Sequence, residues 1–197
     1  MKTFRIISVM AVLLISMTSF GQKIKIESGK MSALKGMTDM KIEYDYSNLS
    51  VGKFDAEADY VAKKVADMNE DEAGTGDKWH AAWLDDRTTR YEPKFEELLA
   101  DYAEFINSGQ EVESEYLMNV HTSFIEPGFN VGVARKPAYI NLEISVSKAG
   151  DELVNILIIK SPGGGAMGYD FDAGYRIQEA YAKAAKSLGK YMTKNLN

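Results

Sequence analysis

The sequence predicts an α+β domain in which one antiparallel or mixed sheet of about four to five strands carries helices packed on one face. Segments in which apolar and polar residues alternate occur before the middle of the chain and again in its second half. Segments with helical periodicity lie between them and at the C-terminus. The predicted order is therefore β-α-α-β-β-β-α, and strands and helices grouped in this way favour α+β over a regularly alternating α/β fold.

Alternation locates the strands. The segment 40–46 alternates apolar and charged residues, with Met40, Ile42, Tyr44 and Tyr46 on the apolar side. The segment 116–124 shows the same pattern less cleanly, and a short strand is possible over 23–26. The clearest alternation is in 140–146, which is followed by the turn residues Ala149, Gly150 and Asp151 and by the apolar segment 153–159. These last two segments are predicted to form an antiparallel hairpin.

Helical periodicity locates the helices. In the segment 54–72 one apolar face is formed by Ala58, Val61, Val65 and Met68. The segment 77–109 predicts a short helix followed by a longer one, with Pro93 in the first turn of the longer helix and Gly109 at its end. A final amphipathic helix is predicted over 172–193.

The N-terminus has the features of a signal peptide. Lys2 and Arg5 precede an apolar stretch of about ten residues, and the small residues Ser19 and Gly21 suit signal peptidase. A membrane-spanning helix needs about twenty apolar residues. We therefore expect residues 1–21 to be cleaved before Gln22, and residues 22–197 to form a single domain without stable membrane insertion. The expected location is the periplasm or the exterior of the cell.

Composition excludes several classes of function. The chain has no cysteine, which excludes disulfides, thiolate metal sites and a lipidated N-terminus. Its net charge is −6, from 23 basic and 29 acidic residues. Removing Lys2 and Arg5 leaves 21 basic and 29 acidic residues, a net charge of −8. Such a charge disfavours nonspecific binding to nucleic acid or anionic lipid.

A glycine-rich segment, 161–175, resembles a nucleotide-binding loop because it contains Gly163-x-Gly165-x-x-Gly168. A dinucleotide site also needs a second parallel strand and an acidic residue about twenty positions further on. The chain offers only the C-terminal helix there, and Tyr169 and Asp170 replace the residues of a phosphate loop. We interpret the segment as a strand-to-helix linker and expect no cofactor. The histidine and carboxylate spacings also match no zinc or calcium motif, so no metal is expected.

The segment 125–139 is long for a connection between strands. It places the apolar Phe129 and Val131 beside Arg135 and Lys136 in an acidic protein. Exposed apolar residues next to basic ones are typical of a partner-binding patch. The alternative is that Val131, with Val133, belongs to a buried edge strand, and the sequence leaves both interpretations open.

Three further residues are candidates for ligand binding. Trp79 and Trp83 share one helical face and could line a cavity in a small-ligand carrier. His121 lies on the polar side of a predicted strand and could be the general base of a small hydrolase if a carboxylate lies beside it. No complete catalytic motif accompanies it, so we assign no catalytic residue.

The sequence resembles a group of uncharacterised exported proteins of Bacteroidetes. The resemblance rests on SFGQ at the cleavage site and on YDYSNLSVGKF, WLDDRTTRYEPKFEELL and FNVGVARKPAYINLEISV, which begin at residues 44, 83 and 129. The second half is also similar, more weakly, to small envelope domains such as the N-terminal domain of TolB and the lipoprotein LpoB. The resemblance implies a noncatalytic binding or scaffolding role with an envelope protein or another cell-envelope component as partner. The chain departs from lipoproteins in lacking a cysteine to carry lipid.

Overall fold

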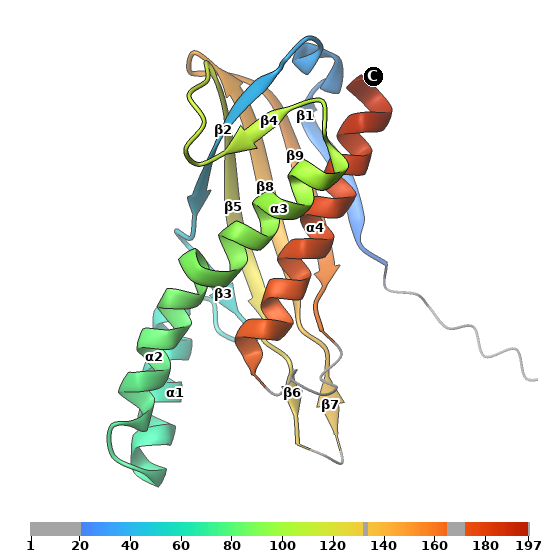
Figure 1. The fold of residues 1–197 in the computed structure, drawn as a ribbon. Helices are drawn as coiled ribbons and strands as arrows, with labels where there is room; N and C mark the ends of the chain where they lie inside the picture. The colour runs from blue at the N-terminus through green and yellow to red at the C-terminus, as the bar shows by residue number, and fades with distance from the viewer. Residues whose placement is uncertain (1–20, 132–133, 165–171, 197) are drawn as a thin grey trace, which may run out of the picture.

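The computed structural model describes residues 21–131, 134–164 and 172–196 of the chain (Figure 1). One mixed sheet of seven strands has the order β1-β9-β8-β5-β2-β4, and β3 pairs with β5 off this path. Its strands are β1 (Lys23–Gly29), β2 (Asp39–Asp45), β3 (Ser50–Val51), β4 (Asn107–Gly109), β5 (Tyr116–Glu126), β8 (Tyr139–Lys148) and β9 (Asp151–Pro162). The expected α+β class with one antiparallel or mixed sheet is therefore confirmed, and the sheet is mixed.

The sheet is antiparallel on one side and parallel on the other. β1, β9, β8 and β5 are antiparallel neighbours, whereas β2 and β3 run parallel to β5, and β4 runs parallel to β2. Parallel neighbours need a long crossover, which the intervening helices provide. The predicted β8–β9 hairpin is also confirmed: its turn consists of Ala149 (φ 49°) and Gly150 (φ 94°), the left-handed conformations that a two-residue hairpin turn requires.

Helices cover one face of this sheet. α3 (Glu92–Tyr102) and α4 (Ala173–Leu196) lie side by side across it, while α1 (Glu57–Asp71) and α2 (Thr75–Asp86) form a helical hairpin that extends past one end of the sheet (Figure 1). A short 3-10 helix, Met31–Leu34, follows β1. α3 and α4 approach each other closely, because a Cβ added at Gly189 would lie 2.8 Å from Cβ of Tyr102.

The core lies between the sheet and the two helices. The inward-facing residues of β2, β5, β8 and β9 are buried, Tyr44 only partly, and α4 presents Ile177, Ala180, Tyr181, Ala184 and Leu188 to them. Alternate residues of the same strands are only partly buried, so the opposite face of the sheet is a half-polar surface. Among the described residues, no helix combines the length and the apolar character needed to cross a membrane.

Three details differ from the sequence prediction. The described order is β-β-β-α-α-α-β-β-β-β-β-β-α rather than β-α-α-β-β-β-α, because short strands and a third helix were not separated in the sequence. The sheet has seven strands rather than four to five, because β3 and β4 have two and three residues and are too short to show alternation. The helix that contains Pro93 ends at Tyr102, and Gly109 lies in β4. Ile106 is nevertheless buried, which explains why its apolar character appeared to continue the helical pattern.

Candidate interaction site at the hairpin end of the sheet

A second, two-stranded sheet projects from the end of the main one. β6 (Phe129–Asn130) and β7 (Arg135–Lys136) pair antiparallel, with Phe129 opposite Lys136. The hairpin extends beyond the ends of β5 and β8, at the same end of the molecule as α1 and α2 (Figure 1). Phe129 is 45% exposed and Val131 is 65% exposed. We call Phe129, Val131, Arg135 and Lys136 the hairpin-end surface.

This arrangement decides between the two interpretations of Val131. It lies outside the main sheet and is exposed, so it does not belong to a buried edge strand of that sheet. Arg135 and Lys136 are also exposed, on the returning strand. The structure thus brings all four predicted partner-binding residues onto one projecting hairpin. Val133 and the glycines Gly165 and Gly168 of the glycine-rich segment lie outside the described residues.

The base of the hairpin is braced by buried polar groups. Glu126, whose side chain is 10% exposed, forms an ion pair with Lys136 at 2.5 Å and accepts a hydrogen bond from the Gly128 backbone N–H at 3.2 Å. Arg176, buried in α4, donates to the Pro127 and Gly128 carbonyls at 3.0 and 3.3 Å. Gly128 has φ +65°, and a Cβ there would lie 2.3 Å from the Lys136 carbonyl oxygen, so the base requires glycine. The hairpin is therefore held in a defined direction.

Two pockets flank this base. One, of about 360 Å³, lies between the β3 loop, α1 and the hairpin and is lined by Phe54, Tyr60, Glu126 and Lys136 among others. The second, of about 300 Å³, is lined by Lys136, Pro137, Ala138, Tyr139, Lys160 and Pro162. Burial, reinforced by the charge of Glu126, raises the pKa of Tyr60 to about 12, so its hydroxyl stays protonated at neutral pH. Lys136 lines both pockets, which could each receive a side chain from a partner.

Trp79 and Trp83 pack against each other and against Tyr60 of α1. Their rings stack on each other with centroids 5.6 Å apart, and Tyr60 packs 5.4 Å from the Trp83 ring. Trp83 is only 4% exposed, and its indole N–H donates to Glu57 at 2.6 Å. These contacts form the aromatic core of the α1–α2 hairpin. The two tryptophan rings therefore pack within the helical hairpin, and the small-ligand carrier stays a prediction.

His121 lies apart from both tryptophans, on the helix-free face of the sheet. Its Nδ1 is 3.1 Å from Asp45 Oδ2, on the neighbouring strand, although the two groups are not aligned for a hydrogen bond. Hydrogen bonds from Ser47 lower the pKa of Asp45, and its ion pair with His121 adds to this effect. Ser47 donates its hydroxyl to the same carboxylate at 2.9 Å. The carboxylate that the hydrolase hypothesis requires therefore lies beside His121, and the hypothesis stays a prediction.

Sequence reasoning missed a polar cluster where α2 meets α3. A five-residue π-helix, Arg87–Tyr91, joins the two helices into one run. Arg87 binds both carboxylate oxygens of Glu57, and its guanidinium lies 4.2 Å from the Tyr46 ring centroid. Glu92 accepts hydrogen bonds from Tyr46 and Gln110, and burial raises its pKa. The five side chains come from separate parts of the chain, so no local pattern in the sequence could reveal the cluster.

The fold and the site define an α+β protein with a braced, projecting hairpin. No protein-family model matches the chain, and no curated protein sequence matches it. Among solved structures, it is similar to the PelC dodecamer from Paraburkholderia phytofirmans in two crystal forms, one of them of a point variant. The TM-scores are 0.36 and 0.34 at 10% and 9% identity, and each match covers 83% of this chain and 96% of the other. At these values the similarity carries no argument about function.

Proposed function

We propose that this protein is an exported, noncatalytic binding or scaffolding protein of the bacterial cell envelope, and that the hairpin-end surface contacts a partner protein. The observation that carries the proposal is the exposure of Phe129 and Val131 on a hairpin whose base is fixed by Glu126 and Arg176. Apolar side chains on a pre-organised element lose little conformational freedom on docking, and their burial releases water. Such residues are typical anchors of protein interfaces.

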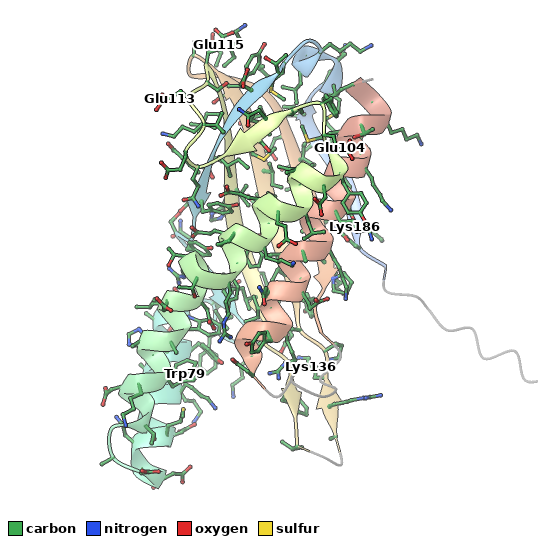
Figure 2. The ribbon with its side chains drawn as sticks, in the orientation of Figure 1. Trp79, Glu104, Glu113, Glu115, Lys136 and Lys186 are labelled. Atoms are coloured by element: carbon green, nitrogen blue, oxygen red, sulfur yellow. The ribbon has the colours of Figure 1, made fainter. Side chains whose placement is uncertain are left out.

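The charge distribution specifies the chemistry of the partner. The exposed Arg135 lies beside the apolar pair, and Lys136 on the same strand is paired with Glu126, although the protein as a whole has a net charge of −6. Glu113 and Glu115 lie at the opposite end of the sheet from Lys136 (Figure 2). A partner with an apolar recess and an acidic rim would match the hairpin and be repelled from the acidic end. This complementarity would orient the two proteins.

The cell-envelope location is proposed from the sequence. Residues 1–21 have the charged start, apolar core and small-residue cleavage site of a signal peptide. The resemblance to exported proteins of Bacteroidetes and to TolB- and LpoB-like envelope domains supports the same location and a binding role.

The test is photo-crosslinking in native cells. A photoreactive residue placed at Ala134, next to the hairpin strands, is expected to give one dominant protein adduct that mass spectrometry can identify. Phe129→Ser should lower the adduct yield at least about tenfold, because loss of an apolar anchor costs about 1.4 kcal/mol or more of binding free energy. Folding of the variant is checked by circular dichroism.

Leu84→Ser is the matched control. Leu84 is 44% exposed, nearly the same as Phe129, but it lies on α2. The control should leave the adduct yield unchanged. If both variants reduce the yield equally, or if neither does, the hairpin is not the contact surface. A photoreactive chain that gives no protein adduct would contradict the binding role itself.

A further inference from the structure

A groove of about 660 Å³ lies between the C-terminal parts of α3 and α4, and it shares no residue with the hairpin-end surface. It is lined by Asp101, Tyr102, Glu104, Phe105, Lys190, Thr193 and Lys194. The acidic side chains come from the end of α3 and the turn after it, and the basic ones come from α4. Figure 2 shows Glu104 at the end of α3 and Lys186 on the neighbouring α4. The groove therefore has an acidic side and a basic side.

The opposite charges of the groove do not neutralise each other. Within residues 21–131, 134–164 and 172–196, no carboxylate pairs with Lys190 or Lys194, and no cation pairs with Asp101 or Glu104. Opposite charges attract a ligand only while they remain unpaired, because an existing ion pair would have to be broken first. The groove thus keeps both a site for a cation and a site for an anion.

The basic side is built around one aromatic ring. The Nζ atoms of Lys186 and Lys190 lie 4.8 Å and 5.2 Å from the ring centroid of Tyr102. Thr193 donates its hydroxyl to the Tyr102 carbonyl at 2.7 Å, and Gly189 lets α4 approach this residue closely. The ring is therefore fixed, and it holds two ammonium groups near each other. An anion bound to both would relieve their repulsion through charge-assisted hydrogen bonds.

The acidic side lies at the negative end of a helix. Asp101 is in the last turn of α3, Glu104 follows two residues after the helix ends, and this last turn contains no basic residue. The free carbonyl groups at a helix C-terminus add a partial negative charge to that of the two carboxylates. An ammonium group, which has three hydrogen-bond donors, matches this combination of acceptors.

We propose that the groove binds a zwitterion of the phosphoethanolamine class. Its ammonium group is bound by Asp101 and Glu104, and its phosphate by Lys190 and Lys194. A simple anion would be repelled by the acidic side, and a simple cation by the basic side. The two charges of the ligand must be separated by several bonds, because the two sides belong to different helices and do not touch. Phosphate oxygens outnumber those of a carboxylate, so one phosphate can accept hydrogen bonds from several lysines.

The test is isothermal titration calorimetry of the purified protein with phosphoethanolamine at low ionic strength. We expect saturable binding at one site, and at least about tenfold weaker binding of ethanolamine or inorganic phosphate, each of which makes only half of the contacts. Asp101→Asn and Lys190→Gln should each weaken phosphoethanolamine binding at least about tenfold. Absence of saturable binding up to about 10 mM ligand, or equal affinity for phosphate and phosphoethanolamine, would overturn the proposal.

Lys183→Gln is the matched control for Lys190→Gln. Lys183 is on the same helix but pairs weakly with Glu179, at 3.8 Å, and does not line the groove. This variant should bind phosphoethanolamine as the wild type does. An equal loss in both lysine variants would show that only the overall charge matters, and would overturn the site.

A second measurement identifies the source of the ligand. The protein is mixed with phosphatidylcholine vesicles that contain or lack phosphatidylethanolamine, and the bound fraction is separated by flotation. Binding only to the vesicles with phosphatidylethanolamine, and its loss in Asp101→Asn, would assign the groove to a lipid head group. Binding of soluble phosphoethanolamine without binding to vesicles would assign it to a free small molecule. Vesicle binding that persists in Asp101→Asn would contradict lipid recognition by this groove.

Discussion

At the scale of single residues, Glu57 at the start of α1 links this helix to α2 and, through Arg87, to the sheet. Its carboxylate accepts the Trp83 indole N–H and both contacts from Arg87, and the side chains of Glu57 and Arg87 are each only 20% exposed. Arg87 in turn lies over the ring of Tyr46, which is next to β2. One carboxylate therefore fixes α1 to both α2 and the sheet.

Replacing Glu57 with Gln should lower the free energy of unfolding by about 1–3 kcal/mol, because Arg87 would keep its charge in a partly buried site without a carboxylate. The measurement is urea denaturation followed by tryptophan fluorescence. Asp67→Asn in the same helix is the control. Asp67 pairs with Lys63, but the two side chains are 56% and 54% exposed, so the loss should be below about 0.5 kcal/mol. Equal losses in both variants would show that the Glu57 contacts add no more stability than a surface pair.

The sequence predicted candidate residues that are neighbours in the chain better than it predicted contacts between distant segments. It selected Phe129, Val131, Arg135 and Lys136 together because they are neighbours in the chain, and the structure places them on one hairpin. It also selected Trp79, Trp83 and His121, which the fold separates: the tryptophans form a helical core, and His121 lies on the sheet (Figure 2 labels Trp79). Contacts such as Arg87 with Tyr46 depend on the crossover between β2 and β5, which periodicity cannot supply.

At the scale of elements, the start of α4 is held by an ionic network. Asp172 accepts a hydrogen bond from the Gly174 backbone N–H at 2.8 Å and pairs with Arg90 at 2.7 Å. Arg90 also contacts Asp86 at 3.0 Å and lies 4.3 Å from the Tyr175 ring centroid. Burial alone would raise the pKa of Asp172, but the hydrogen bonds from Arg90 and Gly174 outweigh it, and the pKa lies below its ordinary value.

A lowered carboxyl pKa makes the contribution of Asp172 depend on pH. The folded protein holds the ionised form more strongly than the unfolded chain, so the stabilisation is fully present above the ordinary pKa of about 3.9. It is lost as the pH falls through the lowered value. Asp172→Asn keeps the oxygen that caps Gly174 but removes the charge. We expect the variant to be less stable than the wild type at neutral pH, and the difference to vanish in acid.

The measurement is urea denaturation of both proteins at several values from about pH 7 to about pH 2, which is below the lowered pKa. A difference in stability that stays constant over this range would show that the charge of Asp172 does not hold the helix. A difference that grows in acid would contradict the direction of the pKa shift.

Strands and helices that are long enough to show a hydrophobic repeat could be predicted from the sequence. Short elements that exist only through their pairing with another element could not. The segments 40–46, 140–146 and 153–159 show alternation because one face of each is buried, and all three are strands. The π-helix Arg87–Tyr91 was missed because its one wider turn leaves the apolar spacing of the flanking helices nearly intact. β4 was missed because it exists only through its pairing with β2.

At the scale of the whole molecule, stability should be uneven. α4 buries eleven of its residues, whereas Val61 is the one buried residue of α1. The α1–α2 hairpin extends beyond the end of the sheet, and only the end of the hairpin nearest the sheet contacts the rest of the protein (Figure 1). Local opening of such an element costs less free energy than global unfolding.

Hydrogen exchange should reveal this difference. Amides in 62–71 are expected to exchange at least about a hundredfold faster than those in 177–192, because α1 can separate from α2 without disturbing the sheet. The exchange of both segments is followed by mass spectrometry in the intact protein. Equal protection would mean that the helical hairpin and the sheet open only together.

The position of β1 has a consequence for the order in which the chain assembles. β1 is the first strand made, yet its neighbour in the sheet is β9, with Lys23 opposite Ile159. A chain that emerges from a ribosome or a translocation channel with its N-terminus first must keep β1 unpaired until almost everything else has appeared. β5, β8 and β9 can meanwhile form a local meander. Among the described strands, β1 therefore cannot join the sheet before β9 has been made, and a chain released before β9 is complete cannot close that edge.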